Sequence, residues 1–261
     1  VDSMTKQSIP PSEWIIVSHN SSQVAKDFLN QVSKKHDWIS VVSVDDDSKR
    51  KRGSQIAKLV NLGLSQTYLN WDFFSKIDAD MILPRDYFER IFSEFLNSEK
   101  LGIASGTCFI LSNNSKKIEK VSEDHTRGGL KTYRRPCFEE IGGIREIDGW
   151  DGVDNIKAQM NGWETKSFFN SQVQHQRRTG SHSGLIAGCF ESGRFAHTMG
   201  YFPPFMVARS LHRMFSKPIF LGGISMFMGY LYSILTRQNR VTEPEVVAFL
   251  RKKQKKRLKL L

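Results

Sequence analysis

Two aspartates one residue apart, Asp78 and Asp80, are the side chains of this sequence best suited to chemistry. They follow the apolar run 71–77 (WDFFSKI), which predicts a buried strand, so both carboxylates lie at the carboxyl end of that strand. Ligands of open α/β sheets bind at this edge. A divalent cation such as Mg²⁺ or Mn²⁺ removes the repulsion between two close carboxylates and can bridge to phosphate oxygens. A solvated acidic turn is the alternative interpretation.

The elements that must position this turn can be predicted from the spacing of apolar residues. Apolar runs predict strands at 13–17, 38–44, 71–77, 101–111 and 168–174. Helical spacing predicts helices at 24–32, 56–64, 84–96, 137–141 and 154–160, and residues 112–129 form a polar, glycine-rich stretch. Strands that alternate with helices through short connections indicate an α/β fold with a mostly parallel sheet flanked by helices.

Three blocks of the sequence carry a resemblance to a known family. They are the strand at 14–17 with its polar turn, the Asn61-Leu62-Gly63 helix leading to Asp78-Ala79-Asp80, and residues 128–162 with GGLKTYRR, IGGI and GWDGVD. On these blocks, residues 14–178 resemble the family-2 glycosyltransferases, which have the GT-A fold. The resemblance implies that Asp78 and Asp80 hold Mg²⁺ or Mn²⁺ against the diphosphate of a nucleotide-sugar donor, with Asp80 the direct ligand.

The same resemblance implies a general base in the GWDGVD block. The family usually has two adjacent acids at the start of a helix, and here Val153 replaces the first, so Asp154 is the expected base and Asp151 the second candidate. Such a base takes the proton of the acceptor hydroxyl during a single displacement, which inverts the anomeric configuration. The alternative for Asp154 is a favourable interaction with the helix dipole.

The resemblance suggests further site residues, each with a structural alternative. Trp150 would stack on a sugar ring or pack in the core. Tyr133 and Arg134 would line the donor or acceptor site, or take part in surface salt bridges. His175 would be a metal ligand or phosphate contact, or would be structural. The expected donor-binding cations are Lys58, Arg177 and Arg178, although the family's usual basic residue lies two positions after Lys58.

The start of the sequence departs from the family, which has a strand and a helix before the equivalent of 14–17. Only thirteen residues precede Trp14 here. Either the sequence is truncated or the pocket for the nucleotide base is built differently, so the donor cannot be identified from the sequence.

Composition favours anionic partners, because 38 Lys and Arg stand against 27 Asp and Glu, a formal charge of +11. The densest basic cluster, 251–259, follows an uncharged run at 218–235, which predicts a helix in the membrane surface rather than a buried helix or a true span. We expect residues 213–261 to contact a membrane. Nucleic acid is not an expected partner, since no binding motif is present. Three separated cysteines without a CxxC pair fit a reducing compartment.

The sequence therefore predicts two regions: a GT-A-like catalytic domain at 1–199 and a helical, hydrophobic then basic, membrane-associating extension at 200–261. The expected function is an inverting, metal-dependent glycosyltransferase of hexosyltransferase type. It would act on a glycan or lipid-linked acceptor at the cytoplasmic face of the cell membrane, in polysaccharide biosynthesis. Two alternatives stay open: a nucleotidyltransferase that makes nucleotide sugars, and a non-catalytic basic membrane-binding module derived from the fold.

Overall fold

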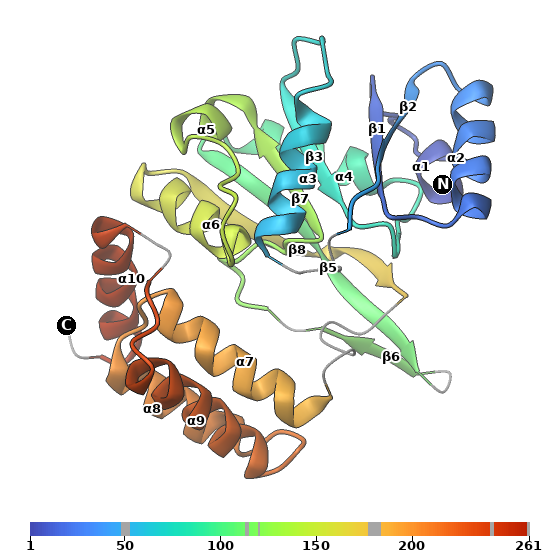
Figure 1. Ribbon diagram of the computed structural model, residues 1–261. Helices are drawn as coiled ribbons and strands as arrows, with labels where there is room; N and C mark the ends of the chain where they lie inside the picture. The colour runs from blue at the N-terminus through green and yellow to red at the C-terminus, as the bar shows by residue number, and fades with distance from the viewer. Residues whose placement is uncertain (48–52, 113–114, 120, 177–183, 241–242, 260–261) are drawn as a thin grey trace. The chain divides into compact units, whose positions relative to one another are not determined.

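The computed structural model describes residues 1–47, 53–112, 115–119, 121–176, 184–240 and 243–259 (Figure 1). The chain divides into two compact units, Val1–Gln176 and Arg177–Leu261. The division falls before the expected boundary at 199/200, because the helix at 185–198 packs with the helices that follow it.

The first unit alternates strands and helices, and the predicted α/β class is confirmed. Its elements are, in order, α1 (Asp2–Thr5), β1 (Trp14–His19), α2 (Gln23–Lys35), β2 (Ile39–Val44), α3 (Ser54–Leu64), β3 (Phe73–Ile77), β4 (Met81–Ile82), α4 (Tyr87–Asn97), β5 (Leu101–Ser112), β6 (Ser115–Ile118), β7 (Leu130–Arg134), α5 (Arg135–Glu140), α6 (Trp150–Met160) and β8 (Glu164–His175).

The strands form two sheets (Figure 1). β1 and β2 pair in parallel as a two-stranded sheet, and the six-stranded sheet has the order β3-β7-β5-β8-β4 with β6 paired to β5. β5 and β8 are parallel, while β7 is antiparallel to both β3 and β5. β3, β5 and β8 therefore point in one direction, and the antiparallel strands β4, β6 and β7 lie between or beside them.

The antiparallel strands are the ones that the apolar pattern does not predict. β4 has only two residues, and β6 (SKKI) lies inside the polar stretch 112–129. In β7 (LKTYR) the polar residues Lys131 and Thr132 are fully buried. A strand that buries a lysine and a threonine lacks the alternation of apolar and polar residues by which strands are recognised.

Apolar side chains cover both faces of the six-stranded sheet. Because successive residues of a strand point to opposite faces, Phe73 and Phe74 of β3 enter different clusters. The cluster around Phe73 contains the buried face of α4, including Tyr87 and Phe95. The cluster around Phe74 contains residues of α3, α5 and α6, including Trp150. The turn that follows β3 therefore sits above a closely packed core.

The second unit consists of α7 (Leu185–Thr198), α8 (Pro203–Arg213), α9 (Leu221–Leu235) and α10 (Pro244–Arg257). α7 and α9 pack through their backbones: a Cβ atom at Gly193 would lie 1.8 Å from the Met226 carbonyl oxygen, and one at Gly229 would lie 2.0 Å from that of Phe190. Only glycine allows this approach. Within the described part of the chain, no helix has both the length and the apolar character needed to cross a bilayer.

Candidate active site

The turn containing Asp78 and Asp80 lies at the carboxyl end of β3, as predicted, but its two carboxylates face different partners. Asp78 forms an ion pair with Lys76, while Oδ1 of Asp80 lies 3.5 Å from Nε2 of His175. Asp80 is therefore the aspartate that faces an imidazole, and Asp78 is engaged by a lysine of its own strand.

The pairing of β4 with β8 brings Asp80 and His175 together. Met81 pairs with His175 in this antiparallel ladder, and the backbone N–H of Gln176 donates to the Asp80 carbonyl oxygen over 2.9 Å. Two residues almost a hundred positions apart thus become neighbours through the shortest strand of the sheet. Both residues are candidates from the sequence alone, but the apolar pattern does not predict β4, the strand that joins them.

Glu119 contacts the second ring nitrogen of His175, and Arg127 in turn contacts Glu119. Nδ1 of His175 lies 3.2 Å from Oε2 of Glu119, and the guanidinium of Arg127 lies 2.9 Å from the same oxygen. A carboxylate at Nδ1 favours the tautomer that carries its hydrogen on Nδ1, which makes Nε2, the nitrogen that faces Asp80, the atom with a lone pair for a metal ion. Sequence reasoning missed Glu119, since it lies just after β6 in the polar stretch.

The Asp80–His175 pair has the donor atoms that a divalent ion needs. A carboxylate oxygen and an imidazole nitrogen 3.5 Å apart can reach one cation between them, and Mn²⁺ accepts both kinds of ligand. Among the described residues, no group of three His, Cys, Asp or Glu side chains is arranged to hold an ion. Two protein ligands suit ions that take their remaining ligands from water and phosphate. Arg177 and Arg178, the predicted phosphate contacts, lie outside the described residues.

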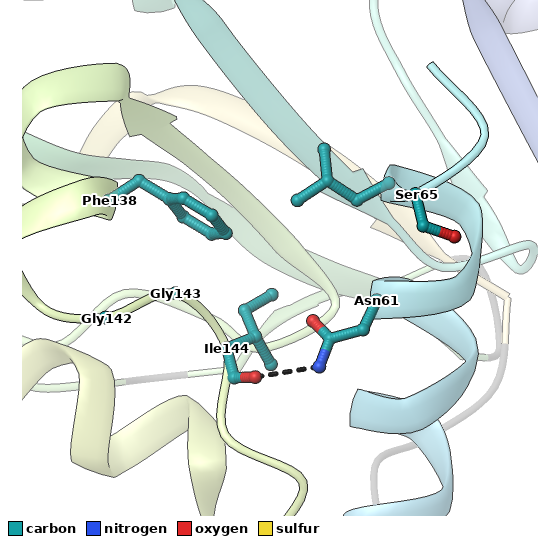
Figure 2. A pocket seen from close by; sticks show the side chains of 7 residues that line it. Asn61, Ser65, Phe138, Gly142, Gly143 and Ile144 are labelled. Carbon is teal, nitrogen blue, oxygen red and sulfur yellow. Dashed lines mark hydrogen bonds between the residues drawn. The ribbon is translucent and has the colours of Figure 1, made fainter. Parts of the chain in front are cut away.

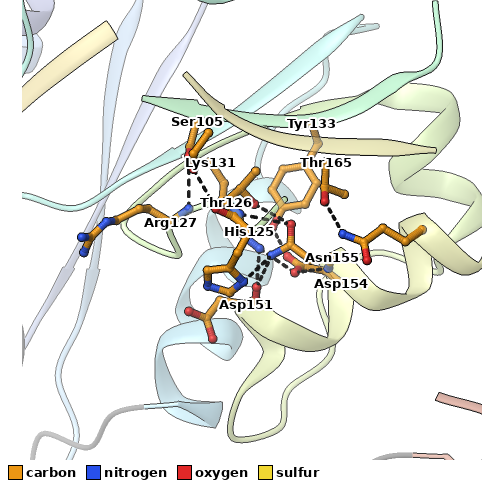
Figure 3. A network of polar contacts seen from close by, with 12 residues as sticks. Ser105, His125, Thr126, Arg127, Lys131, Tyr133, Asp151, Asp154, Asn155 and Thr165 are labelled. Carbon is orange, nitrogen blue, oxygen red and sulfur yellow. Dashed lines mark hydrogen bonds and ion pairs between the residues drawn. The ribbon is translucent and has the colours of Figure 1, made fainter. Parts of the chain in front are cut away.

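Asp154, the predicted base, is locked in a buried polar network (Figure 3). The Asp154 side chain is 3% exposed. Its Oδ1 accepts hydrogen bonds from Lys131 Nζ at 2.5 Å and from the Asn155 N–H at 2.6 Å. Its Oδ2 accepts a hydrogen bond from the Tyr133 hydroxyl. Burial and the neighbouring Asp154 carboxylate raise the pKa of Tyr133 well above its ordinary value. With both carboxylate oxygens engaged and only 3% exposure, Asp154 does not face an open site here, and this geometry favours Asp151, the second candidate, as the base.

Asp151, the second candidate, is half-buried in the first turn of α6, which starts after Gly149 in a left-handed conformation (φ 80°). Its backbone carbonyl is fixed by two donors, Lys131 Nζ at 2.5 Å and Asn155 Nδ2 at 2.7 Å. Lys131 thus connects Asp151 to Asp154. The buried pair anchors the helix start and leaves the Asp151 carboxylate as the acid available to solvent.

Two consecutive glycines, Gly128 and Gly129, lie against Asp151 and Asp78, respectively. A Cβ atom at Gly129 would lie 2.4 Å from Oδ2 of Asp78, and one at Gly128 would lie 2.5 Å from Oδ2 of Asp151. The Gly129 carbonyl also accepts a hydrogen bond from the Asp78 N–H, at 2.9 Å. Any larger side chain at either position would displace one of these carboxylates, which explains the glycine pair of the GGLKTYRR block.

Lys76 and Lys131 are a directly opposed pair on β3 and β7, and both are buried. Two facing ammonium groups would repel each other. Each instead pairs with an aspartate, Asp78 or Asp154, and each lies 5.6 Å from the centre of the Trp150 ring. Trp150 is only 5% exposed, which favours its structural alternative: the ring packs in the core and stabilises two buried cations.

Three other residues that were predicted to contact the substrate or the donor lie away from the Asp80–His175 pair or are buried. Tyr133 is fully buried and donates to Asp154. Arg134 donates to the carbonyl oxygens of Leu101, Phe95 and Ser98, so it joins β7 to β5 and to the end of α4 instead of lining an open site. Lys58 is exposed on α3, and within the described residues it forms no hydrogen bond or ion pair with the other site residues.

α3 holds the loop that leads to Asp151. Asn61 donates to the Ile144 carbonyl at 2.9 Å, and Asp148 accepts from the Ser54 N–H at 2.9 Å at the start of the helix. A cavity of about 330 Å³ lies beside this contact (Figure 2). Its lining residues are Asn61, Leu64, Ser65, Phe138, Gly142, Gly143 and Ile144. It contains none of the aspartates discussed above, so it is distinct from the candidate active site.

His125 is a further ionisable group of this region that the sequence analysis did not single out. Nδ1 of His125 lies 3.5 Å from Nδ2 of Asn155, on the side of the network that carries Asp151 (Figure 3). Burial, followed by the nearby Lys131 ammonium, lowers the pKa of His125 below its ordinary value. The imidazole is therefore neutral beside Asp151.

Comparison with known proteins relates the fold to nucleotide-sugar enzymes. The structure of a mannosyltransferase from Pyrobaculum calidifontis, in complex with GDP-Man and Mn²⁺, is similar with a TM-score of 0.54 at 14% identity, covering 100% of this chain and 75% of that one. The structure of GalNAc-T7 with UDP, GalNAc and Mn²⁺ is similar with a TM-score of 0.55 at 12% identity, covering 90% of this chain and 54% of that one. No protein-family model matches the sequence, and neither does any curated protein. The likeness shows that the chain has the predicted GT-A fold.

Proposed function

We propose that this protein is a metal-dependent glycosyltransferase that transfers a hexose from a nucleotide-diphosphate donor to a glycan or lipid-linked acceptor, with inversion. The observation that carries the proposal is the Asp80–His175 pair, which lies where β3 and β8 of a GT-A fold reach their carboxyl ends. That position is where α/β sheets bind their ligands. Support also comes from the two similar structures, since each was solved with Mn²⁺ and a nucleotide or nucleotide sugar.

Asp80 and His175 would hold Mg²⁺ or Mn²⁺, and Mn²⁺ suits the mixed carboxylate and imidazole donors better. The cation, when bound, would neutralise charge on the donor's diphosphate. Glu119 would keep the His175 tautomer fixed, and Lys76 would restrain the Asp78 carboxylate next to Gly129. Asp78 would then contact the donor rather than compete for the cation.

Asp151 would act as the general base in the transfer step. Its carboxylate would take the proton of the acceptor hydroxyl while that oxygen forms a bond to the anomeric carbon. The bond between the anomeric carbon and the diphosphate oxygen breaks in the same step, and its electron pair leaves with the nucleoside diphosphate. One displacement at one carbon inverts its configuration. The buried Lys131–Asp154 pair would position Asp151 through the backbone of α6.

A panel of nucleoside diphosphates tests the proposal. The protein is heated with UDP, GDP or dTDP, each with and without Mn²⁺, and the unfolding temperature is recorded. We expect at least one diphosphate to raise that temperature only when Mn²⁺ is present, because a ligand that binds the folded state stabilises it. Stabilisation by nucleoside triphosphates together with sugar phosphates, and by no diphosphate, would instead indicate a nucleotidyltransferase.

A further inference from the structure

The second unit carries an apolar surface that the active site does not explain. α9 buries one face, which includes Gly222, Met226, Gly229, Tyr230 and Ser233. The opposite face is also apolar, and its side chains are 48–81% exposed: Leu221, Ile224, Met228, Tyr232 and Leu235. These five residues recur at intervals of three and four, so they form one continuous stripe along the helix. A helix that is apolar on both faces is expected to be buried on both faces, so the exposed face of α9 is expected to contact a partner.

The connection between α8 and α9 extends this stripe at one end. Phe215, Ile219 and Phe220 all lie in the connection and are more than half exposed. A contiguous group of exposed large apolar side chains marks an interaction surface rather than ordinary solvent-facing protein. We call the stripe of α9 and these three residues the α9 face.

The charges of the segment that carries the α9 face are of one sign, and on the neighbouring helix α7 the Arg194 guanidinium, 5.9 Å from the centre of the Tyr232 ring, is paired with Glu191. The sequence contains no Asp or Glu between Glu191 and Glu243, a segment that includes α8 and α9. It contains cations at both ends of the α9 stripe: Arg213 and Lys217 before it, Arg237 and Arg240 after it. The face therefore offers apolar side chains framed by positive charge.

This pattern distinguishes between the possible occupants of the face. In a symmetric pair of antiparallel α9 helices, the cations at one end of a helix would meet those at the other end of its partner, with no acid in the segment to neutralise them. An anionic lipid surface meets both requirements, because acyl chains accept the apolar stripe and headgroups pair with the flanking cations.

We propose that the α9 face is a docking surface for an anionic lipid bilayer, with α9 lying in the plane of the interface. This narrows the membrane contact predicted for residues 213–261 to one side of one helix and its preceding connection. α10 contributes differently: it packs onto its own unit, where Gln254 accepts from the Phe202 N–H at 2.7 Å, and its basic side chains add charge rather than apolar contact. The inference rests on residues outside the candidate active site and stands independently of the proposed function.

Vesicle co-sedimentation tests the proposal with the full chain. Vesicles of phosphatidylcholine alone are compared with vesicles that also contain phosphatidylglycerol, at low and high salt. We expect binding to the anionic vesicles and its weakening by salt, because screening shortens the range of the attraction. Lys217→Gln with Arg237→Gln is expected to weaken binding by about fivefold for each cation removed, the effect of about 1 kcal/mol per basic residue.

The apolar part of the surface is tested by Ile224→Glu with Met228→Glu. Both positions are about half exposed, so the double variant is expected to fold, as its unfolding temperature would verify, and to lose vesicle binding. Leu96→Glu is the matched control: Leu96 is 82% exposed on α4 of the first unit and is expected to leave binding unchanged. Equal binding by the double variant and the parent would overturn the proposal.

Light scattering in the absence of lipid identifies the competing occupant. We expect the parent protein and the double variant to have the same molar mass. A parent dimer that the Ile224→Glu and Met228→Glu changes convert to a monomer would show that a second copy covers the α9 face, and would contradict lipid docking. Vesicle binding that is equally strong without phosphatidylglycerol would contradict the electrostatic half of the proposal.

Discussion

Lys131 and Asp154 form a buried ion pair in which Nζ and Oδ1 are 2.5 Å apart and the side chains are 0% and 3% exposed. Breaking such a pair leaves one charge without its partner inside the protein. We therefore expect Asp154→Asn to lower the free energy of unfolding by about 3–5 kcal/mol. Asp86→Asn, which breaks an exposed pair with Arg90, is the control and is expected to cost less than about 1 kcal/mol.

Asp151→Asn should show the opposite combination of effects. Asp151 is half-buried at the start of α6, and the group that Lys131 and Asn155 hold there is its backbone carbonyl, which the substitution keeps. We expect denaturant unfolding close to that of the parent and a loss of sugar transfer of at least about a hundredfold, the contribution of a general base. Full transfer activity in Asp151→Asn would show that another group takes the proton.

The two glycines of the GGLKTYRR block give a matched pair of variants. In Gly129→Ala the new methyl group would meet Asp78, and in Gly128→Ala it would meet Asp151. We expect Gly129→Ala mainly to weaken nucleotide binding, measured by calorimetry, and Gly128→Ala mainly to lower kcat with the nucleotide affinity retained. Identical effects of the two variants on both quantities would be evidence against separate roles for the two aspartates.

Glu119→Gln probes the positioning of His175. Loss of the carboxylate at Nδ1 removes what fixes the imidazole tautomer, and such outer partners typically change metal affinity by about 10–100-fold. We expect Mn²⁺ affinity to fall within that range, and the ¹⁵N spectrum of His175 to change from one tautomer to a mixture. An unchanged spectrum together with unchanged affinity would show that Glu119 does not position His175.

His125 predicts a pH dependence of stability. Burial, and then the Lys131 ammonium, place its folded-state pKa below the ordinary 6.5. The unfolded chain therefore binds a proton in a pH range where the folded chain does not, so the free energy of unfolding falls as the pH drops below about 6.5. In His125→Gln this part of the fall should disappear. An NMR titration checks the cause directly, and a midpoint at or above 6.5 would exclude it.

The order of the main elements could be predicted because it follows from apolar periodicity. The strand before Asp78 and the amphipathic helix containing Asn61 appear where the spacing of apolar residues places them, while the helix predicted at 154–160 begins four residues earlier, at Trp150. The placement of Asp80 and His175 could not be predicted from periodicity, because it depends on β4, a strand of two residues. Strands this short have no period to detect.

The choice between the two candidate bases, Asp151 and Asp154, could not be predicted for a different reason. The family pattern favours Asp154 over Asp151, but the spacing of apolar residues does not separate the two acids, since both lie near the start of one helix. The two acids differ in the structure because Lys131 pairs with only one of the two carboxylates. Lys131 is fully buried on β7, a strand that the apolar pattern does not predict. Burial of a lysine is rare and carries no local signal, because it depends on an aspartate twenty-three positions away that neutralises it. Only the folded structure shows that Lys131 pairs with Asp154 and not with the Asp151 carboxylate.

The most direct test of the proposed metal site is Mn²⁺ binding followed by electron paramagnetic resonance in the presence of a nucleoside diphosphate that stabilises the protein. The signal of free Mn²⁺ is expected to decrease on adding the parent protein and to stay unchanged on adding Asp80→Asn, while Asp86→Asn behaves like the parent. If Asp80→Asn bound Mn²⁺ as tightly as the parent, Asp80 and His175 would not be the ligands, and the proposed donor site would be wrong.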